Sequence, residues 1–251
     1  MAEEYVRFVH HGKPVWGRHA GGRLELLSAA PWADAKSTGE SIASNGVEWL
    51  APAEPTKIIC VGLNYKDHAA EMGHGLPEEP VLFMKPASAL LDPGKSIRLP
   101  RSSQRVDYEA ELAFVIGKKV GPGIDDEDAI FGYTCANDVT ARDLQKKDGQ
   151  WTRAKGFDTF CPLGPSLWRG IDVSDLSVAC RVNGQVKQQS RTSQMIFAPH
   201  QILNFVAEIM TLNPGDVILT GTPSGIGPLA AGDAVDIQIE GLGSLHNLVI
   251  A

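Results

Sequence analysis

Long hydrophobic runs and concentrations of positive charge are both missing from this sequence. No apolar run reaches the roughly 18 residues that a membrane-spanning helix needs, and the acidic start lacks the pattern of a signal peptide. The formal net charge is −7, with no run of lysines or arginines. This balance argues against nucleic acid or an anionic membrane as the main partner. We therefore expect a cytoplasmic protein that binds a small molecule.

Cysteine is scarce as well. The four cysteines are Cys60, Cys135, Cys161 and Cys180, and their spacings match neither CxxC nor a zinc ribbon. Three of them lie in apolar or strand-like surroundings, so we interpret the cysteines as reduced core residues. No GxSxG segment occurs either, which argues against a serine hydrolase.

The rest of the composition is that of an ordinary globular protein. With 251 residues, of which 43% are hydrophobic and 21% charged, the chain can bury a sizeable core. Strand-like runs separated by turn signals in residues 5–27 predict a small β meander, and Pro52 and Pro55 then punctuate the chain. We place a domain boundary there. It divides a small N-terminal β-rich domain, residues 1–53, from a main domain, residues 54–251.

The main domain has many strand candidates and few helices. The strand candidates are residues 57–62, 81–84, 108–116, 177–182, 217–220, 234–239 and 246–250. The best helix candidate is residues 201–210, with Pro199 near its start and turn residues after it. This pattern predicts a mainly β architecture with minor helices.

Three carboxylates alternate along the candidate strand that begins near residue 107. In a strand, Asp107, Glu109 and Glu111 share one face, and the Cβ atoms of residues two apart lie roughly 7 Å from each other. Carboxylates this close in an apolar strand repel one another and are costly to desolvate. A hard divalent cation such as Mg²⁺, Mn²⁺ or Ca²⁺ removes that cost. The alternative is the solvated face of an exposed strand.

A second polar motif follows at residues 137–145. Asp138 and Arg142 are four residues apart and would share a face of one helical turn, with Gln145 three residues further on. One interpretation is a local ion pair. The other makes Asp138 a third metal ligand and leaves Arg142 to bind a substrate carboxylate as a bidentate fork.

His68 and Glu71 form a third pattern, three residues apart in a short helix candidate. A glutamate beside a histidine fixes its tautomer and raises its basicity, which suits a general base acting on water. The alternative is an ordinary surface pair.

The fourth pattern is a glycine-rich loop at residues 219–228. It would let backbone N–H groups approach an anion closely, although such loops are usually plain turns. It is neither a Walker A motif nor GxGxxG.

Taken in order, these motifs resemble the fumarylacetoacetate hydrolase superfamily. The resemblance is to the branch of acylpyruvases, oxaloacetate decarboxylases and 2-hydroxymuconate isomerases and decarboxylases. The matching segments, within residues 57–251, are residues 59–68, 80–86, 107–112, 137–145, 155–165 and 219–227. The resemblance implies a mixed β-sandwich roll, usually in a homodimer, beside a small N-terminal domain to which we assign no chemistry.

The resemblance also implies roles for particular residues. One Mg²⁺ or similar ion would be held by Glu109, Glu111 and Asp138. The catalytic residues would be His68, Glu71 and Lys155, the first two on a segment that in relatives orders as a lid. The substrate contacts would be Arg142, Gln145, Thr222 and Lys85.

From these roles we expect hydrolytic C–C cleavage of an acylpyruvate-like 2-oxo acid. His68, oriented by Glu71, would activate the water that attacks the distal carbonyl, and the metal would stabilise the leaving enolate. Oxo-acid decarboxylation and 2-hydroxymuconate isomerisation pass through the same enolate and stay open as alternatives. A non-catalytic, metal-stabilised module is a further alternative, against which the retained charged residues argue.

Overall fold

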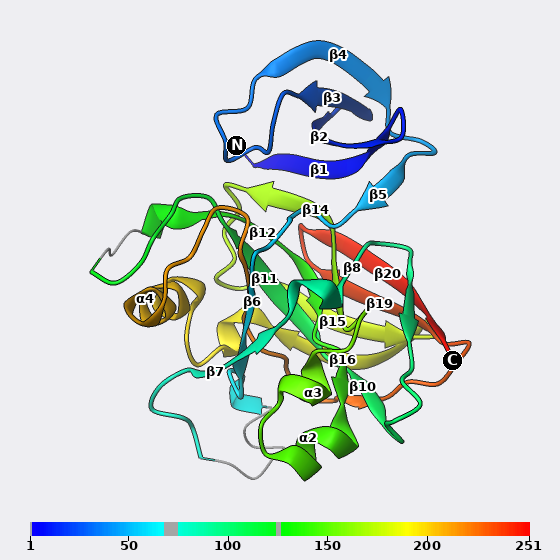
Figure 1. The fold of residues 1–251 in the computed structure, drawn as a ribbon, viewed down its shortest axis with the longest axis vertical. Helices are drawn as coiled ribbons and strands as arrows, with labels where there is room; N and C mark the ends of the chain where they lie inside the picture. Colours follow the sequence, from blue (N-terminus) through cyan, green and yellow to red (C-terminus); the bar gives the residue numbers. More distant parts are fainter. Residues whose placement is uncertain (1, 68–74, 124–126) are drawn as a thin grey trace.

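The computed structural model describes residues 2–67, 75–123 and 127–251 (Figure 1). Among them, the strands form a 12-stranded mixed sheet, a five-stranded sheet and a three-stranded sheet, with few helices. This confirms the predicted mainly β architecture. All four cysteines are buried and free, as expected of reduced core residues.

The N-terminal segment is an antiparallel meander, as its turn signals predicted (blue in Figure 1). Its strands are β1 (Glu3–His10), β2 (Lys13–Ala20), β3 (Arg23–Leu27), β4 (Ser37–Ala43) and β5 (Glu48–Leu50). Val6, Phe8, Leu24 and Leu26 give it a small core of its own. β1 also pairs with β14 (Cys161–Arg169), so the meander continues the main sheet. The division into domains at residue 53 stays a prediction.

The main sheet continues from β14 in the order β12, β11, β17, β6 and β7. Their bounds are β6 (Ile58–Gly62), β7 (Val81–Lys85), β11 (Ala110–Ile116), β12 (Ile130–Asn137) and β17 (Val217–Leu219), and β8 (Leu90–Leu91) pairs with β14. Every residue of the central strand β11 is buried, because cores lie against both of its faces. A strand buried on both faces must be apolar almost throughout, which makes the carboxylate of Glu111 exceptional.

A second sheet packs against the main one and completes the sandwich. Its order is β16 (Gln185–Arg191), β15 (Ser177–Val182), β19 (Ala234–Ile239), β20 (Gly243–Ile250) and β9 (Ser96–Arg98). Buried residues alternate along β15, β19 and β20, so one face lies on the core and the other faces outwards. The three-stranded sheet is β13 (Thr140–Ala141), β10 (Val106–Tyr108) and β18 (Gly227–Pro228).

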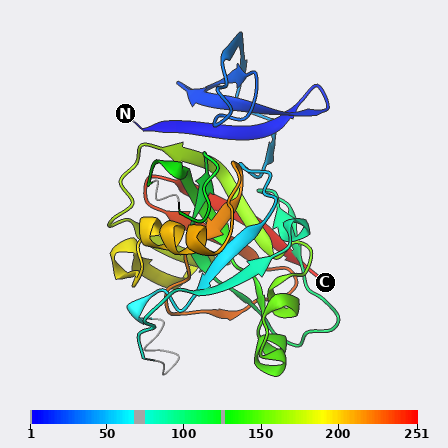
Figure 2. The same ribbon diagram turned by 60° about the vertical axis from the view of Figure 1, so that its left-hand side comes forward.

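The helices lie around this sandwich (Figure 2). Those within the described residues are α2 (Arg142–Asp148), α3 (Thr152–Lys155) and α4 (Pro199–Ile209), with 3-10 turns at Ala87–Ala89, Glu127–Ala129 and Thr192–Gln194. The predicted helix at 201–210 begins two residues earlier, because Pro199 opens the first turn and Gln201 Oε1 accepts the Ala198 N–H. Among the described residues, no helix combines the length and apolar character needed to cross a membrane.

Candidate active site

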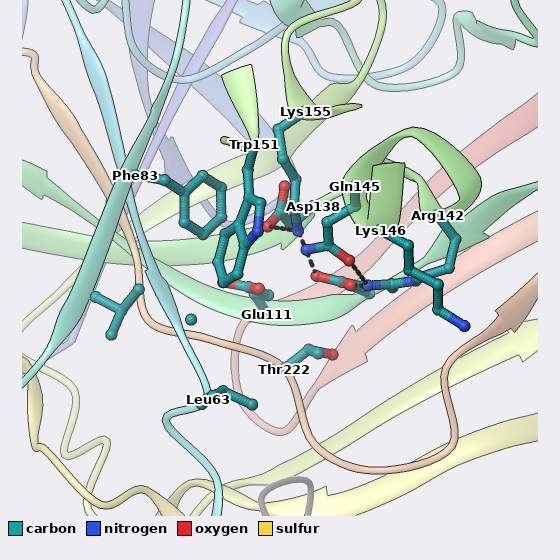
Figure 3. A pocket seen from close by; sticks show the side chains of 13 residues that line it. Leu63, Phe83, Glu111, Asp138, Arg142, Gln145, Lys146, Trp151, Lys155 and Thr222 are labelled. Carbon is teal, nitrogen blue, oxygen red and sulfur yellow. Dashed lines mark hydrogen bonds and ion pairs between the residues drawn. The ribbon is translucent and has the colours of Figure 1, made fainter. Parts of the chain in front are cut away.

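A cavity of about 220 Å³ lies where the main sheet meets α2 and α3 (Figure 3). It collects side chains from strands, helices and loops that are far apart in the sequence. The lining residues are Val61, Gly62, Leu63, Phe83, Glu109, Glu111, Asp138, Arg142, Gln145, Lys146, Trp151, Lys155 and Thr222. Seven of the residues expected at the site from sequence are among them.

Three buried carboxylates meet in this cavity. Oxygen atoms of Glu109, Glu111 and Asp138 all lie within 4.8 Å of one another. The expected unbroken strand from residue 107 is wrong, because the ladder stops at Glu109, between β10 and β11. There the Glu109 N–H donates to Asn137 Oδ1, and the Glu109 carbonyl accepts the Asp138 N–H. The break between β10 and β11 is therefore the point at which the backbone of Glu109 bonds to that of Asp138.

The carboxylates of this cluster differ in the hydrogen bonds that they accept. Glu111 Oε2 accepts the Gly221 N–H at 2.7 Å. Asp138 Oδ1 lies 2.6 Å from Lys85 Nζ, but it accepts no well-directed hydrogen bond, because that ammonium donates its protons to three backbone carbonyls. Burial raises the pKa of Glu111 well above its ordinary value, and the carboxylates of Asp138 and Glu109 raise it further.

This donor set fits a divalent cation. Three carboxylates supply the hard oxygen ligands that Mg²⁺, Mn²⁺ and Ca²⁺ prefer. A cation would also offset the repulsion that raises the pKa of Glu111. Glu109, Glu111 and Asp138 could therefore bind a metal ion.

Lys155 bridges two of the three carboxylates. Its Nζ donates to Glu109 Oε2 at 2.9 Å and to Asp138 Oδ2 at 2.6 Å, and it lies 4.8 Å from the centre of the Phe83 ring. Burial alone would lower the pKa of Lys155, but Asp138 and Glu109 outweigh burial and raise it. The side chain is therefore a fixed ammonium at the cavity wall.

Lys85, expected from sequence to contact substrate, lies elsewhere. It is buried and does not line the cavity. Its Nζ donates to the carbonyls of Val139, Lys155 and Phe160 at 2.8–3.0 Å, so it joins three chain segments behind Asp138. Lys85 therefore supports the position of Asp138, and its expected contact with substrate stays a prediction.

Arg142 has different partners from those expected. A helical pair with Asp138 is wrong, because α2 begins at Arg142 and Asp138 precedes the helix. Nε donates to Asp107 Oδ2 at 2.9 Å, one terminal nitrogen donates to Glu109 Oε1, and Nη1 donates to Gln145 Oε1 at 2.6 Å. All three nitrogens thus bond protein oxygens, which uses three of the five N–H donors of the guanidinium. The substrate contact expected of Arg142 stays a prediction. Asp107, which also pairs with Arg105, anchors this arrangement.

Thr222 reaches the cavity from the glycine-rich loop. Its hydroxyl donates to the Ala110 carbonyl at 2.9 Å and accepts from Gln188 Nε2 at 2.9 Å. Gln188, on β16, also accepts the Ala110 N–H and so replaces the missing ladder partner at the start of β11. No sequence pattern had indicated Gln188.

The glycine-rich loop needs glycine where its backbone lies close to a neighbouring segment. Gly221 has a φ of +97°, and a Cβ there would lie 2.8 Å from Asn64 Cβ. Its N–H donates to the Glu111 carboxylate, so the anion that the loop approaches is a side chain of the protein.

An aromatic wall bounds the side of the cavity opposite α2 in the view of Figure 3. Phe83 and Trp151 meet edge to face, with ring centroids 5.1 Å apart. Trp151 packs directly on the backbone of Gly62, where a Cβ would come within 2.8 Å of the indole. Phe83 lies in the predicted strand at residues 81–84 but was not expected at the site, and no sequence pattern had indicated Trp151.

His68 and Glu71, the expected water-activating pair, lie outside the described residues. Their roles stay predictions.

Comparisons with known proteins agree with this architecture. The model for the C-terminal domain of fumarylacetoacetate hydrolase matches residues 57–250, and a model described as Rv2993c-like, N-terminal matches residues 4–52. The uncharacterized protein MJ1656 of Methanocaldococcus jannaschii is 59% identical over 198 residues, which cover 78% of this chain and 84% of that protein. The mitochondrial oxaloacetate tautomerase fahd2 of Xenopus laevis is 48% identical over 225 residues, 83% of this chain and 70% of that one.

A solved structure extends the similarity over nearly the whole chain. The 5-carboxymethyl-2-hydroxymuconate delta-isomerase from Mycobacterium smegmatis matches with a TM-score of 0.90 and 42% identity, covering 98% of this chain and 99% of that one. The resemblance seen in the sequence motifs is thereby confirmed. The chain belongs to the fumarylacetoacetate hydrolase family of enzymes.

Proposed function

We propose that the protein is a metal-dependent enzyme that moves a proton beside the oxo group of a small 2-oxo carboxylic acid, as a tautomerase or isomerase. The observation that carries this proposal is the convergence of Glu109, Glu111 and Asp138 at a cavity large enough for such an acid. The activities named for the similar Xenopus and Mycobacterium smegmatis proteins support the same choice.

The chemistry begins with the three carboxylates. A divalent cation held by Glu109, Glu111 and Asp138 would supply a Lewis acid for the 2-oxo and carboxylate oxygens of the substrate. Lys155 adds a fixed positive charge beside the same position, where negative charge would develop on the oxo oxygen as the carbonyl becomes an enolate. Arg142 holds Glu109 from the opposite side and so fixes the ligand's direction.

The aromatic wall of the cavity, Phe83 and Trp151, would orient the substrate. Phe83 and Trp151 present apolar surface opposite the polar side chains of α2. A substrate between them loses contact with bulk water, which strengthens every electrostatic interaction inside the cavity. Gly62 lets Trp151 approach closely enough to form this wall.

Hydrolytic C–C cleavage is the second candidate. It depends on His68 and Glu71, whose spacing in the sequence suits water activation. His68→Ala should then reduce hydrolysis by roughly 10²–10⁴-fold, the scale of a lost general base, and affect decarboxylation less. Equal losses in both reactions would rule out the water-activating role.

A substrate panel tests these candidates. Metal-stripped protein, with and without Mg²⁺ or Mn²⁺, is given enol-oxaloacetate, 5-carboxymethyl-2-hydroxymuconate, acetylpyruvate and fumarylpyruvate. We expect metal-dependent loss of enol absorbance or isomerisation without release of pyruvate. Pyruvate from an acylpyruvate would instead support hydrolysis, and pyruvate from oxaloacetate would support decarboxylation. If no compound is turned over while the metal is still bound, the result would support the non-catalytic alternative.

We also propose that the chain forms a homodimer, as the family resemblance implies. Val81 and Met84 are exposed on β7, the last strand of the main sheet, and offer apolar surface for such contact. Light scattering on the purified protein checks the oligomeric state. A monomeric mass would contradict the proposal.

A further inference from the structure

Two histidines and a glutamate converge at one end of the N-terminal meander. One ligand atom each of His10, His11 and Glu40 lies within 4.8 Å of the other two. His10 Nε2 is 3.1 Å from Glu40 Oε1, and the centroids of the two imidazole rings are 4.0 Å apart. These residues do not line the cavity, and the proposed function does not use them.

The turn between β1 and β2 brings the two histidines together. Neighbouring side chains of a strand point to opposite faces, so consecutive histidines would ordinarily lie apart. Here β1 ends at His10, and the two turn residues are His11 with a φ of +49° and Gly12 with a φ of +73°. Two positive φ values are typical of a type I′ hairpin turn. The left-handed conformation of His11 thus leaves its ring against that of His10.

A bulge in β4 accounts for the direction of Glu40. Between two successive pairs of the β3–β4 ladder, β3 advances two residues while β4 advances four, from Ser37 to Ser41. Gly39 lies within this bulge at a φ of +82°, and Glu40 follows it. Bulges redirect side chains away from the regular alternation of a strand. Glu40 thereby reaches His10, which lies 30 positions earlier in the sequence.

The second imidazole distinguishes this group from an ordinary surface pair. The chain has another histidine–carboxylate pair, in which His246 Nδ1 lies 2.8 Å from Asp236 Oδ1. Within the described residues, no third ligand atom joins that pair. At His10 and Glu40, His11 supplies the third ligand atom, and three protein ligands are the number that zinc sites with an open position use.

We propose that His10, His11 and Glu40 bind a divalent transition metal ion of the Zn²⁺ class, which joins the β1–β2 turn to β4. Imidazole suits Zn²⁺, Ni²⁺ and Cu²⁺, whereas the carboxylate cluster of the cavity supplies only oxygen. Tetrahedral ligands about 2.1 Å from Zn²⁺ lie about 3.4 Å apart. Because His11 and Glu40 are exposed, small rotations of their side chains close this distance. A water molecule completes the four ligands.

Zn²⁺ titration of the metal-stripped chain tests the site, with the imidazole proton signals followed by NMR. We expect the signals of His10 and His11 to move together with Zn²⁺. Mg²⁺ should leave both unchanged, because it prefers oxygen ligands. The signal of His246 should stay in place at the Zn²⁺ concentration that saturates the other two.

His11→Asn removes one ligand and keeps the turn. Asparagine tolerates a positive φ, and Asn-Gly is a preferred pair in type I′ turns, so the variant should fold at least as well as wild type. Thermal unfolding in EDTA checks this. We expect Zn²⁺ affinity at the site to fall by at least about tenfold, since losing even an outer partner of a metal ligand costs about 10- to 100-fold. His246→Asn is the matched control and should bind Zn²⁺ as wild type does.

Three results would overturn the site. They are the absence of any Zn²⁺-induced shift at His10 and His11, a shift of His10 that persists unchanged in His11→Asn, and equal losses of affinity in His11→Asn and His246→Asn. Any of them would reduce the group to a hydrogen-bonded surface pair. Turnover with Mg²⁺ should be the same in both variants as in wild type, because neither residue lines the cavity. The outcome is therefore independent of the proposed function.

Discussion

Arg142 donates to the carboxylate of Glu109, and this contact joins the first residue of α2 to the cluster of three carboxylates. The same guanidinium is held by Asp107 and by Gln145, so its position is fixed from three sides. Burial alone would lower the pKa of Arg142, but its carboxylate partners outweigh burial and raise it. The arginine is therefore a fixed cation at the cavity wall.

Arg142→Lys should weaken metal binding. A lysine keeps the charge, but its single Nζ cannot stand in for the three separate nitrogens through which Arg142 reaches Asp107, Glu109 and Gln145. We expect the affinity for Mn²⁺ to fall by about 10- to 100-fold, the usual effect of losing a residue that orients a ligand. Calorimetric titration measures it, with Arg153→Lys in an exposed ion pair as the control. Unchanged affinity would show that Glu109 keeps its direction without Arg142.

Gly62→Ala should disturb the aromatic wall and leave the carboxylates in place. The new methyl group would lie 2.8 Å from the Trp151 ring, so the indole must move. We expect kcat/KM to fall by about tenfold, on the scale of a misplaced binding wall, with metal affinity unchanged. A shift in tryptophan fluorescence would accompany the loss. Activity equal to wild type would mean that the wall plays no part in positioning substrate.

Glu111→Gln should remove metal-induced stabilisation at little cost to the metal-free protein. Burial first, and then the carboxylates of Asp138 and Glu109, raise the pKa of Glu111, so its negative charge is costly in the metal-free protein and glutamine removes that charge. In wild type, Mn²⁺ at 100 times its dissociation constant should add about 2.7 kcal/mol of stability. Thermal unfolding with and without Mn²⁺ measures this, with Glu208→Gln on the exposed side of α4 as the control. Equal stabilisation of wild type and Glu111→Gln would exclude Glu111 as a ligand.

Asp216→Asn should destabilise the fold in a pH-dependent way. The buried carboxylate joins β17 to the start of β6, because it accepts from Thr56, Lys57 and Asn213. Burial alone would raise the pKa of Asp216, but these donors outweigh it and lower the pKa. The resulting stability is complete above the unfolded-state pKa of about 4 and is lost as pH falls through the lower folded-state value.

At pH 7 we expect Asp216→Asn to cost about 2–3 kcal/mol. Chemical unfolding at a series of pH values measures it, with the exposed Asp34→Asn as the control. The deficit of the variant should shrink as pH falls below 4. A deficit that is constant down to pH 2 would mean that the charge of Asp216 contributes nothing.

The sequence predicted elements well where apolar residues alternate or run continuously along the chain. Alternating or continuous apolar residues predicted β6, β7, β15, β17 and β19 close to their observed bounds. The carboxylates at residues 109 and 111 stood out because charge is costly inside an apolar strand. Asp138 was identified by its spacing from Arg142 and by the family resemblance. The strands β12 and β14 went unrecognised, because both run through mixed segments without a clear period.

The partners of the polar residues were much harder to predict. Arg142 meets Asp107 only because β10 passes beside the start of α2, a contact between residues 35 positions apart. The interruption at Glu109 depends on Asn137 and Gln188, which supply side-chain oxygens where ladder partners are missing. Such contacts are set by tertiary packing, which local spacing does not encode.

The central claim is that a cation on the three carboxylates carries the reaction, and one titration tests it most directly. Mn²⁺ is added stepwise to metal-stripped wild type and to Glu109→Gln, while bound metal and the rate of enol-oxaloacetate tautomerisation are both followed. We predict that the wild-type rate rises in proportion to occupancy up to one ion per chain, and that Glu109→Gln binds no ion at this site and stays inactive. Full activity of the metal-stripped protein in EDTA, or of Glu109→Gln, would contradict the account.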